Sequence, residues 1–291
     1  MNRPTRRPEG PGFTLAMLIA AVLSLANPAC AAHFQLVIFT GQSNSLGNTN
    51  GGEADPLPGA DPADAKIRFF WNNLANAKTS LGSSDGLFLK LQPQQGGFYK
   101  GNASHWGPEI SFGRSLFHAG VTNLGIIKAS RGGGGNSFWA KGVADRHMYD
   151  HVVKTVTTAT KRLQTEGHTF EIAGLMYLQG ESDSAAEAAI AVQRIKELVD
   201  NLRAELPHAT VMRAVIGGIA AAGATRDIVR ARHTAVAAST PYLSTFSTTD
   251  LRSEMPDALH YNKAAKLAVG ERFARTFMQS AASVGKPAAG R

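Results

Sequence analysis

The sequence predicts an α/β fold, a three-layer α/β/α sandwich with a central, mostly parallel sheet of about five strands. Three observations point to this class. Short apolar runs rich in β-branched and aromatic residues recur along the chain, longer segments carry apolar stripes with helical spacing, and the two kinds of segment alternate. Strands that are buried on both faces and connected through helices form parallel sheets with helices on either side.

The first predicted strand, 34–40, is a nearly continuous apolar run that suits a position covered on both faces. Similar runs follow at 124–129, 172–178, 211–216 and 242–247. Helical patterns lie between and after them at 109–118, 146–164, 226–239 and 263–277, and a further helix is marked by the stripe Ile195, Leu198, Val199, Leu202 and Leu206. The first helix follows Pro108, and proline is favoured in the first turn.

The segment 48–107 interrupts this alternation. It is rich in Gly, Pro, Asn, Asp and Ser and has one short strand-like piece at 66–71. A loop insertion of this length in a compact domain is usually functional, so we expect it to form part of a substrate-binding wall. No linker divides the chain, which predicts one domain over 33–280 followed by a flexible tail at 281–291.

Composition excludes several classes of protein. The chain has 291 residues, of which 43% are hydrophobic, so its bulk is not disordered. Its single cysteine, Cys30, excludes a disulfide scaffold. The net charge of +8 is scattered, without a basic run or a nucleic-acid reading motif, so no nucleic-acid partner is expected. The charge favours solubility or attraction to anionic polymers.

Residues 1–32 have the pattern of a secretory signal peptide. Arg3, Arg6 and Arg7 precede an apolar stretch, which is followed by small residues around Cys30. An uncleaved anchor, a lipoprotein signal and a twin-arginine signal are the alternatives, and the stretch is short for a bilayer span. We expect a secreted or periplasmic protein with no membrane span after cleavage.

A candidate nucleophile follows the first strand, in Gly41-Gln42-Ser43-Asn44-Ser45. Ligands of parallel α/β sheets bind beyond the carboxyl ends of the strands, which places Ser43 well for catalysis. The alternative is a serine that caps the next helix. The pattern is not the nucleophile elbow of α/β-hydrolases, because Ser45 stands where that motif has glycine.

A candidate base lies near the C-terminus, where Asp257 and His260 are three residues apart on a loop before the last helix. A carboxylate against one imidazole nitrogen leaves the other free to take a hydroxyl proton. The alternative is a helix-capping aspartate beside an incidental histidine.

Two further polar segments follow predicted strands. The run Ser130 to Asn136 contains four consecutive glycines, whose N–H groups can approach an oxyanion closely; a phosphate cradle is the competing use. The second segment, Gln179-Gly180-Glu181-Ser182-Asp183, can donate to a substrate oxygen or orient a histidine. All four polar segments therefore meet at the same edge of the predicted sheet.

In this order the segments resemble the SGNH/GDSL hydrolase superfamily. The closest resemblance is to its carbohydrate esterase branch, which includes sialate O-acetylesterase-like proteins and family 6 acetylxylan esterases. The matching stretches are 41–44, Trp106-Gly107-Pro108-Glu109, Lys128 through Trp139, 179–183 and Asp257-x-x-His260. The resemblance implies a flavodoxin-like domain and a serine esterase that needs no metal or other cofactor.

The resemblance also implies roles for individual residues. Ser43 would be the nucleophile, His260 the base and Asp257 its orienting acid. Apart from the resemblance, Glu181 is the alternative acid, because it lies beside Gln179 at the end of the third predicted strand. The oxyanion would be bound by the Ser43 N–H, by Gly132 or Gly133, and by the Gln179 side chain. Substrate contacts are expected from Gln42, Asn44, Trp106 and Trp139, although both tryptophans could equally be core residues.

Other candidates have plainer interpretations. His147 and His151 could share a helix face and bind zinc, but Met148 stands where the metalloprotease motif has glutamate, so no metal site is expected. Glu109 is either a first-turn acid favoured by the helix dipole or a support for the site. The expected activity is removal of O-acetyl groups from a carbohydrate such as sialic acid or xylan. The rivals are a lipase or thioesterase of the same superfamily and a non-catalytic glycan-binding module.

Overall fold

The computed structural model describes residues 31–48, 58–75, 80–95, 104–143 and 147–284. Most of the predicted signal peptide, residues 1–30, lies outside these ranges, and so does 285–291 of the predicted tail. No helix in the described ranges has both the length and the apolar character needed to cross a membrane.

The centre of the fold is a parallel sheet in which the strands follow the order β7-β1-β8-β9-β10. Their bounds are β1 His33–Gly41, β7 Leu124–Ser130, β8 Thr169–Leu178, β9 Arg213–Gly217 and β10 Leu243–Phe246. Counted along the chain without the insertion, this is the flavodoxin-like order 2-1-3-4-5. The predicted fold class is confirmed, and each of the five strands lies where its apolar run was found.

The sheet is larger than predicted because the insertion adds strands to it. Strand β2, Arg68–Leu74, pairs parallel to β7, and the short strands β3, Ser80–Ser83, and β4, Leu89–Lys90, pair antiparallel to β2. The described residues thus form a sheet of eight strands rather than about five. A separate pair, β5 Gln94–Gln95 and β6 Ser104–His105, and the 3-10 helix η2 at Pro62–Ala65 complete the described insertion.

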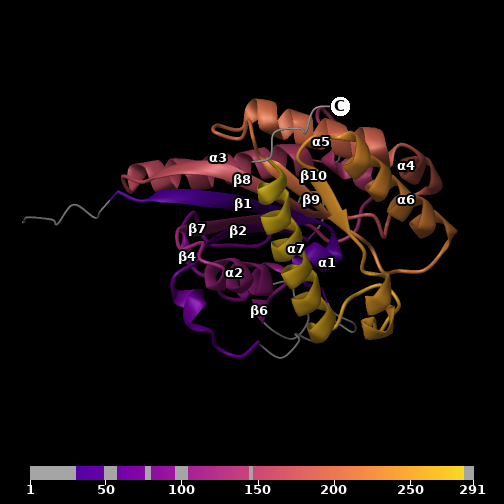
Figure 1. Cartoon of the computed structure of the whole chain (residues 1–291), viewed down its shortest axis with the longest axis horizontal. Coiled ribbons are helices and arrows are strands. Elements are labelled where there is room, and N and C mark those ends of the chain that lie inside the picture. The colour runs from indigo at the N-terminus through magenta and orange to yellow at the C-terminus, as the bar shows by residue number, and fades with distance from the viewer. Residues whose placement is uncertain (1–30, 49–57, 76–79, 96–103, 144–146, 285–291) are drawn as a thin grey trace, which may run out of the picture. The chain divides into compact units, whose positions relative to one another are not determined.

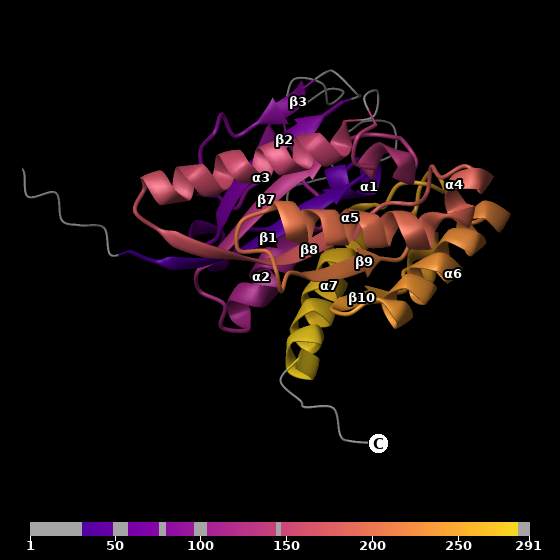
Figure 2. The ribbon, with the colours of Figure 1, turned by 90° about the horizontal axis from the view of Figure 1, so that it is seen from above.

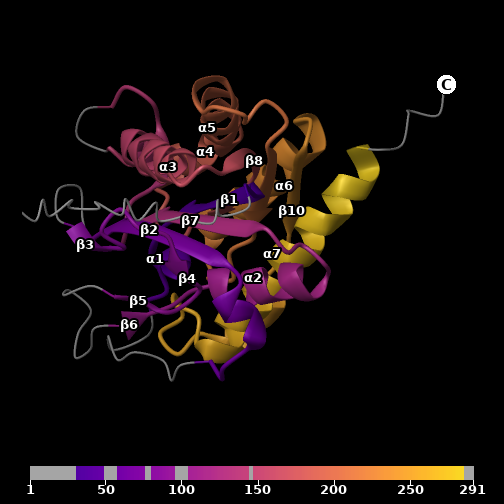
Figure 3. The ribbon, with the colours of Figure 1, turned by 90° about the vertical axis from the view of Figure 1, so that its left-hand side faces the viewer.

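Helices cover both faces of the sheet (Figures 1 and 3). On one face lie α3 Met148–Thr165 and α5 Ala191–Glu205, with α6 Ala224–Ser239 beside α5; on the other lie α2 Glu109–His118 and α7 Lys263–Val284. Shorter elements are α1 Ser43–Leu46, α4 Ala185–Ala189, η3 Asn136–Trp139 and η4 Thr249–Glu254. The last helix is longer than predicted, so 281–284 belong to it and not to a tail.

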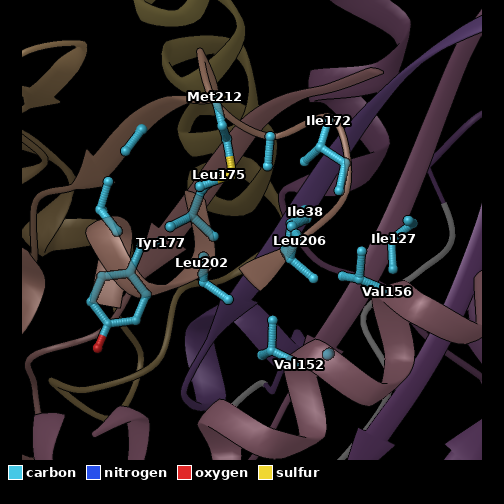
Figure 4. Packing of buried hydrophobic residues seen from close by; sticks show 14 of the residues in the cluster. Ile38, Ile127, Val152, Val156, Ile172, Leu175, Tyr177, Leu202, Leu206 and Met212 are labelled. Carbon is cyan, nitrogen blue, oxygen red and sulfur yellow. The ribbon is translucent and has the colours of Figure 1, made fainter. Parts of the chain in front are cut away.

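Each face of the sheet has its own apolar core. Figure 4 shows the core beneath α3 and α5, in which Ile38, Leu175 and Ile127 of the sheet pack with Val152, Val156 and Leu202 of the helices. The opposite core joins the sheet to α2 and α7 through aromatic side chains such as Phe39, Phe112 and Phe273. Burying a large apolar side chain contributes about 2 kcal/mol, so these layers hold the strand ends in a fixed relation.

The register of the strands brings the polar segments together. Gly41, the last residue of β1, lies opposite Ser130 at the end of β7 and opposite Leu178 at the end of β8. The segments that begin at Gln42, Arg131 and Gln179 therefore leave the sheet side by side. Figure 2 shows α1 at this carboxyl end of the strands.

Candidate active site

Ser43 is the first residue of α1, in a turn whose backbone is closely constrained. Gly41 has φ 149°, and a Cβ there would lie 2.0 Å from the carbonyl oxygen of Leu178. Only glycine fits so near a neighbouring strand in this conformation. The close approach of β1 to β8 thus sets the position of Ser43, which is 5% exposed.

Ser43, His260 and Asp257 form a continuous hydrogen-bonded chain. The His260 Nε2 lies 2.9 Å from Ser43 Oγ, and His260 Nδ1 lies 2.6 Å from Asp257 Oδ2. Because a carboxylate only accepts, Nδ1–H donates to Asp257, and the lone pair of Nε2 accepts from the serine hydroxyl. The arrangement can remove a proton from Ser43 as its oxygen attacks a carbonyl carbon.

Asp257 is held in its orienting position by its own loop. Its Oδ1 accepts from the backbone N–H of Leu259 at 3.0 Å and of His260 at 2.6 Å. Ala258, between Asp257 and Leu259, has φ 59°, a left-handed conformation that closes the turn. Partial burial raises the pKa of Asp257, but the hydrogen bonds from His260 and Leu259 outweigh it and the net pKa is lowered. The carboxyl is therefore ionised beside the imidazole.

Glu181, the alternative acid, contacts other partners. Its Oε2 accepts from Gln42 Nε2 at 2.5 Å and its Oε1 accepts from Asn44 Nδ2 at 2.6 Å. Gln42 and Asn44 are 0% exposed and their amides donate to this buried carboxylate, so they point into the protein and not toward a substrate, contrary to our expectation for both. The sequence placed these residues correctly beside Ser43, but their spacing carries no information about which way the side chains point.

The expected oxyanion donors lie on segments that leave the sheet beside the end of β1. In the described part of the chain, the backbone N–H groups of Ser43 and Gly133 donate to no protein acceptor. Gly133 has φ 64°, a conformation that favours glycine. The Gln179 Nε2 donates to Asp183 Oδ1 at 2.6 Å and, over a longer and therefore weaker contact of 3.5 Å, to the Gly134 carbonyl.

Asp183 joins the glycine loop to Gln179, a role the sequence did not reveal. Its carboxylate accepts from Gln179, from the Asn136 backbone N–H at 2.8 Å and from Asn136 Nδ2 at 2.9 Å. Burial raises the pKa of Asp183 to about 6 despite these hydrogen bonds. The end of the glycine loop and the Gln179 amide are thus fixed by one side chain.

Neither candidate tryptophan can stack on a sugar. Trp106 and Trp139 are each 1% exposed. Trp139 donates from Nε1 to Thr40 Oγ1 at 2.9 Å and packs edge-on against Tyr177. The core interpretation is correct for both residues, and their expected contact with substrate is wrong.

A buried ion pair lies beneath the nucleophile turn. Glu109 Oε2 and Lys128 Nζ are 2.8 Å apart, and both side chains are 0% exposed. Lys128 also donates to the Leu46 carbonyl at 3.2 Å, while Lys266 donates to the Gly47 carbonyl at 2.7 Å. Two buried lysines therefore bind successive carbonyls at the end of α1. Glu109 therefore supports the site and not only its own helix. The sequence signal for this role was Lys128, a charged residue within an otherwise apolar predicted strand.

His151, one of the two histidines considered as zinc ligands, binds a backbone carbonyl. His151 Nε2 donates to the Asn72 carbonyl at 2.7 Å. Within the described ranges, no group of three or more His, Cys, Asp or Glu side chains is placed to hold a metal ion.

Comparisons with known proteins bear on the family and the fold of the chain. Residues 33–279 match the family model of the carbohydrate esterases described as sialic acid-specific acetylesterase. A solved protein from Arabidopsis thaliana is similar with a TM-score of 0.65 and 19% identity, over 84% of this chain and 98% of that one. A carbohydrate acetylesterase from Xanthomonas citri is similar with a TM-score of 0.57 and 13% identity, over 86% of this chain and 56% of that one. No curated protein matches the chain significantly. The two structural similarities support the fold, and the family match supports an esterase.

Proposed function

Because the chain belongs to the sialic acid-specific acetylesterase family of carbohydrate esterases, we propose that it is an exported serine esterase that removes O-acetyl groups from a glycan. The observation that carries this proposal is the hydrogen-bonded chain from Ser43 through His260 to Asp257. It supplies a nucleophile, a base and an orienting acid in one place.

The reaction proceeds in two steps. Ser43 Oγ attacks the acetyl carbonyl carbon while His260 Nε2 takes the hydroxyl proton, which gives a tetrahedral oxyanion. The N–H groups of Ser43 and of Gly132 or Gly133, with Gln179 Nε2, bind that oxyanion. The intermediate collapses to an acetyl ester on Ser43, and the sugar alcohol leaves with the proton from His260.

Water completes the cycle by the same route. The oxygen of a water molecule attacks the acetyl-serine while His260 accepts a proton from that water. The second tetrahedral intermediate then collapses, which releases acetate and returns the proton from His260 to Ser43 Oγ. Asp257 stabilises the imidazolium that forms in each step. The triad activates Ser43 by itself, so the mechanism needs no cofactor or metal.

The substrate class follows from the family, and sialic acid, xylan or a related acetylated glycan is the candidate. The signal-peptide pattern of residues 1–32 supports export to the periplasm or the medium, where the enzyme would encounter such glycans. A lipase or thioesterase of the same superfamily would need an apolar groove, and the polar composition of the insertion at 48–107 argues against one. A non-catalytic glycan-binding module would not need a triad, so the hydrogen-bonded triad argues against that alternative.

Acetate release from a panel of acetylated glycans, measured for the wild type and for Ser43→Ala, tests the proposal. We expect the wild type to release acetate from at least one glycan and Ser43→Ala to lose on the order of 10⁴-fold in rate, with an unchanged circular dichroism spectrum. More than a few per cent residual activity in Ser43→Ala would exclude this nucleophile. Hydrolysis of long acyl esters in preference to acetyl glycans would favour the lipase.

A further inference from the structure

We propose that Glu181 and Asn44 are positioning residues that hold Ser43 against His260 by binding the neighbours of both. The inference rests on the proposed function, because it takes Ser43 and His260 as the reacting pair. It gives Glu181 a task other than orienting the imidazole.

Glu181 binds the residues on either side of the nucleophile. One carboxylate oxygen accepts from Gln42 and the other from Asn44, at 2.5 and 2.6 Å. Glu181 itself is 1% exposed, so water does not compete for these contacts. With both neighbours bound to one carboxylate, the backbone at Ser43 cannot tilt without breaking a charge-assisted hydrogen bond.

Asn44 binds the residues on either side of the base. Its Nδ2 donates to the Leu259 carbonyl at 3.0 Å, and its Oδ1 accepts from the Tyr261 backbone N–H at 3.1 Å. With the bond to Glu181, both hydrogens of the amide and its oxygen have partners. The acceptors on Glu181 and Leu259 require the amide nitrogen of Asn44, and the Tyr261 N–H requires its oxygen, so the orientation of the amide is fixed.

The two sets of contacts form one network between distant parts of the chain. Ser43 and His260 are separated by 217 positions in the sequence, yet their side chains must meet at hydrogen-bond distance. Asn44 is shared by both sets, so the turn after β1 and the loop before α7 are held together next to the reacting atoms. A displacement of about 1 Å between reacting groups costs on the order of 10²-fold in rate, which sets the size of the effect to expect.

Glu181 is itself anchored from a third element. Gly180 has φ 138°, and a Cβ there would lie 2.6 Å from Val229 Cγ1 on α6. Arg226, also on α6, donates from Nε to the Glu181 carbonyl at 3.0 Å. The carboxylate therefore projects from a fixed turn toward Ser43.

The network allows geometry and charge to be tested apart. Gln42 Oε1 is buried and has no hydrogen-bond partner. In Glu181→Gln the new amide can accept from Asn44 and donate to Gln42 Oε1 once the Gln42 amide turns over. This variant removes the negative charge, which interacts electrostatically with His260 and Asp183, but keeps both contacts. Glu181→Ala removes charge and contacts together.

A double-mutant cycle tests the proposal. Asn44→Ala, Glu181→Ala and the double variant are compared with the wild type, together with Glu181→Gln. Glu254→Ala is the matched control, because Glu254 also accepts from an asparagine amide, Asn262 Nδ2 at 2.7 Å, and has no contact with Gln42 or Asn44. The readouts are kcat and KM for an activated acetate ester and the rate at which a fluorophosphonate labels Ser43. Circular dichroism and urea unfolding report the folded fraction.

We expect each single alanine variant to lose about 10²-fold in kcat and in labelling rate, with KM changed less than about threefold. The double variant should lose no more than about threefold beyond the worse single one, because the two residues act as a unit. Glu181→Gln should stay within about tenfold of the wild type, and Glu254→Ala should match it.

Three results would overturn the inference: multiplicative losses in the double variant, losses below about threefold in both alanine variants, or losses that disappear when rates are corrected for the folded fraction. Failure of the proposed function is recognised separately, since the wild-type label would then lie on a residue other than Ser43.

Discussion

The buried ion pair between Glu109 and Lys128 gives a quantitative prediction for Lys128→Met. The substitution keeps the volume of the side chain but leaves the Glu109 carboxylate, which is 0% exposed, with the Gly107 N–H as its one remaining partner among the described residues. Removing one member of a buried pair costs about 3–5 kcal/mol, because an uncompensated charge stays in a region without water. For a domain of this size the loss corresponds to a fall of about 10 °C in Tm.

The chain offers a control of the same chemistry at the surface. Lys141 and Glu205 are 2.7 Å apart, close to the separation of the buried pair, but their side chains are 51% and 37% exposed. An exposed pair contributes at most about 1 kcal/mol, so Lys141→Met should change the free energy of unfolding by less than that. The ion-pair distance and the substitution are nearly the same in the two cases, so the comparison reports on burial together with the hydrogen bond from Lys128 to the Leu46 carbonyl.

Urea unfolding followed by circular dichroism measures both variants, with the free energy taken from the midpoint where the m value is unchanged. Glu109→Gln combined with Lys128→Met should recover about half of the loss, since no buried charge then remains. A cost for Lys128→Met no larger than that for Lys141→Met would refute the reasoning.

Three further predictions concern pH, the oxyanion and metals. Burial lowers the pKa of His233 to about 4, so between that pH and about 6.5 the unfolded chain binds an extra proton and stability falls as pH falls. His233→Gln should reduce the stability lost between pH 7 and 4.5 by about 2.4 kcal/mol in urea titrations, and an unchanged pH slope would contradict this. Gln179→Ala should lower kcat by about 10²- to 10³-fold with a smaller change in KM, whereas a raised KM at normal kcat would make Gln179 a substrate-binding residue. A chelator should leave turnover unchanged, and activity lost in EDTA and restored by zinc would require a metal.

The sequence predicted the arrangement of the main strands well, because a strand buried on both faces must be apolar throughout. It underestimated the sheet at β2, where Phe69, Phe70 and Trp71 are buried within a segment otherwise rich in turn residues. The strand-like piece at 66–71 was recognised, but the turn-rich residues around it gave no sign that it pairs with β7 and extends the main sheet. The last helix continued to Val284 because small residues near its end do not interrupt a helix.

The candidate site shows where local patterns lose information. Asp257 and His260 are three residues apart, so their contact could be expected from spacing. The contacts of Glu181 with Gln42 and Asn44 span 139 and 137 positions, and they depend on the order of strands in the sheet. A polar residue beside a nucleophile can face the substrate or the interior, and only the packing around it decides between the two.

The central claim is that Ser43 carries the acetyl group during turnover. Rapid acid quenching of the wild type during hydrolysis of an activated acetate ester, followed by peptide mass spectrometry, detects such an intermediate directly. The mechanism predicts one added acetyl group on the peptide that contains Ser43, and none on that peptide in Ser43→Ala. An acetyl group on a different residue under the same conditions, with Ser43 unmodified, would contradict it.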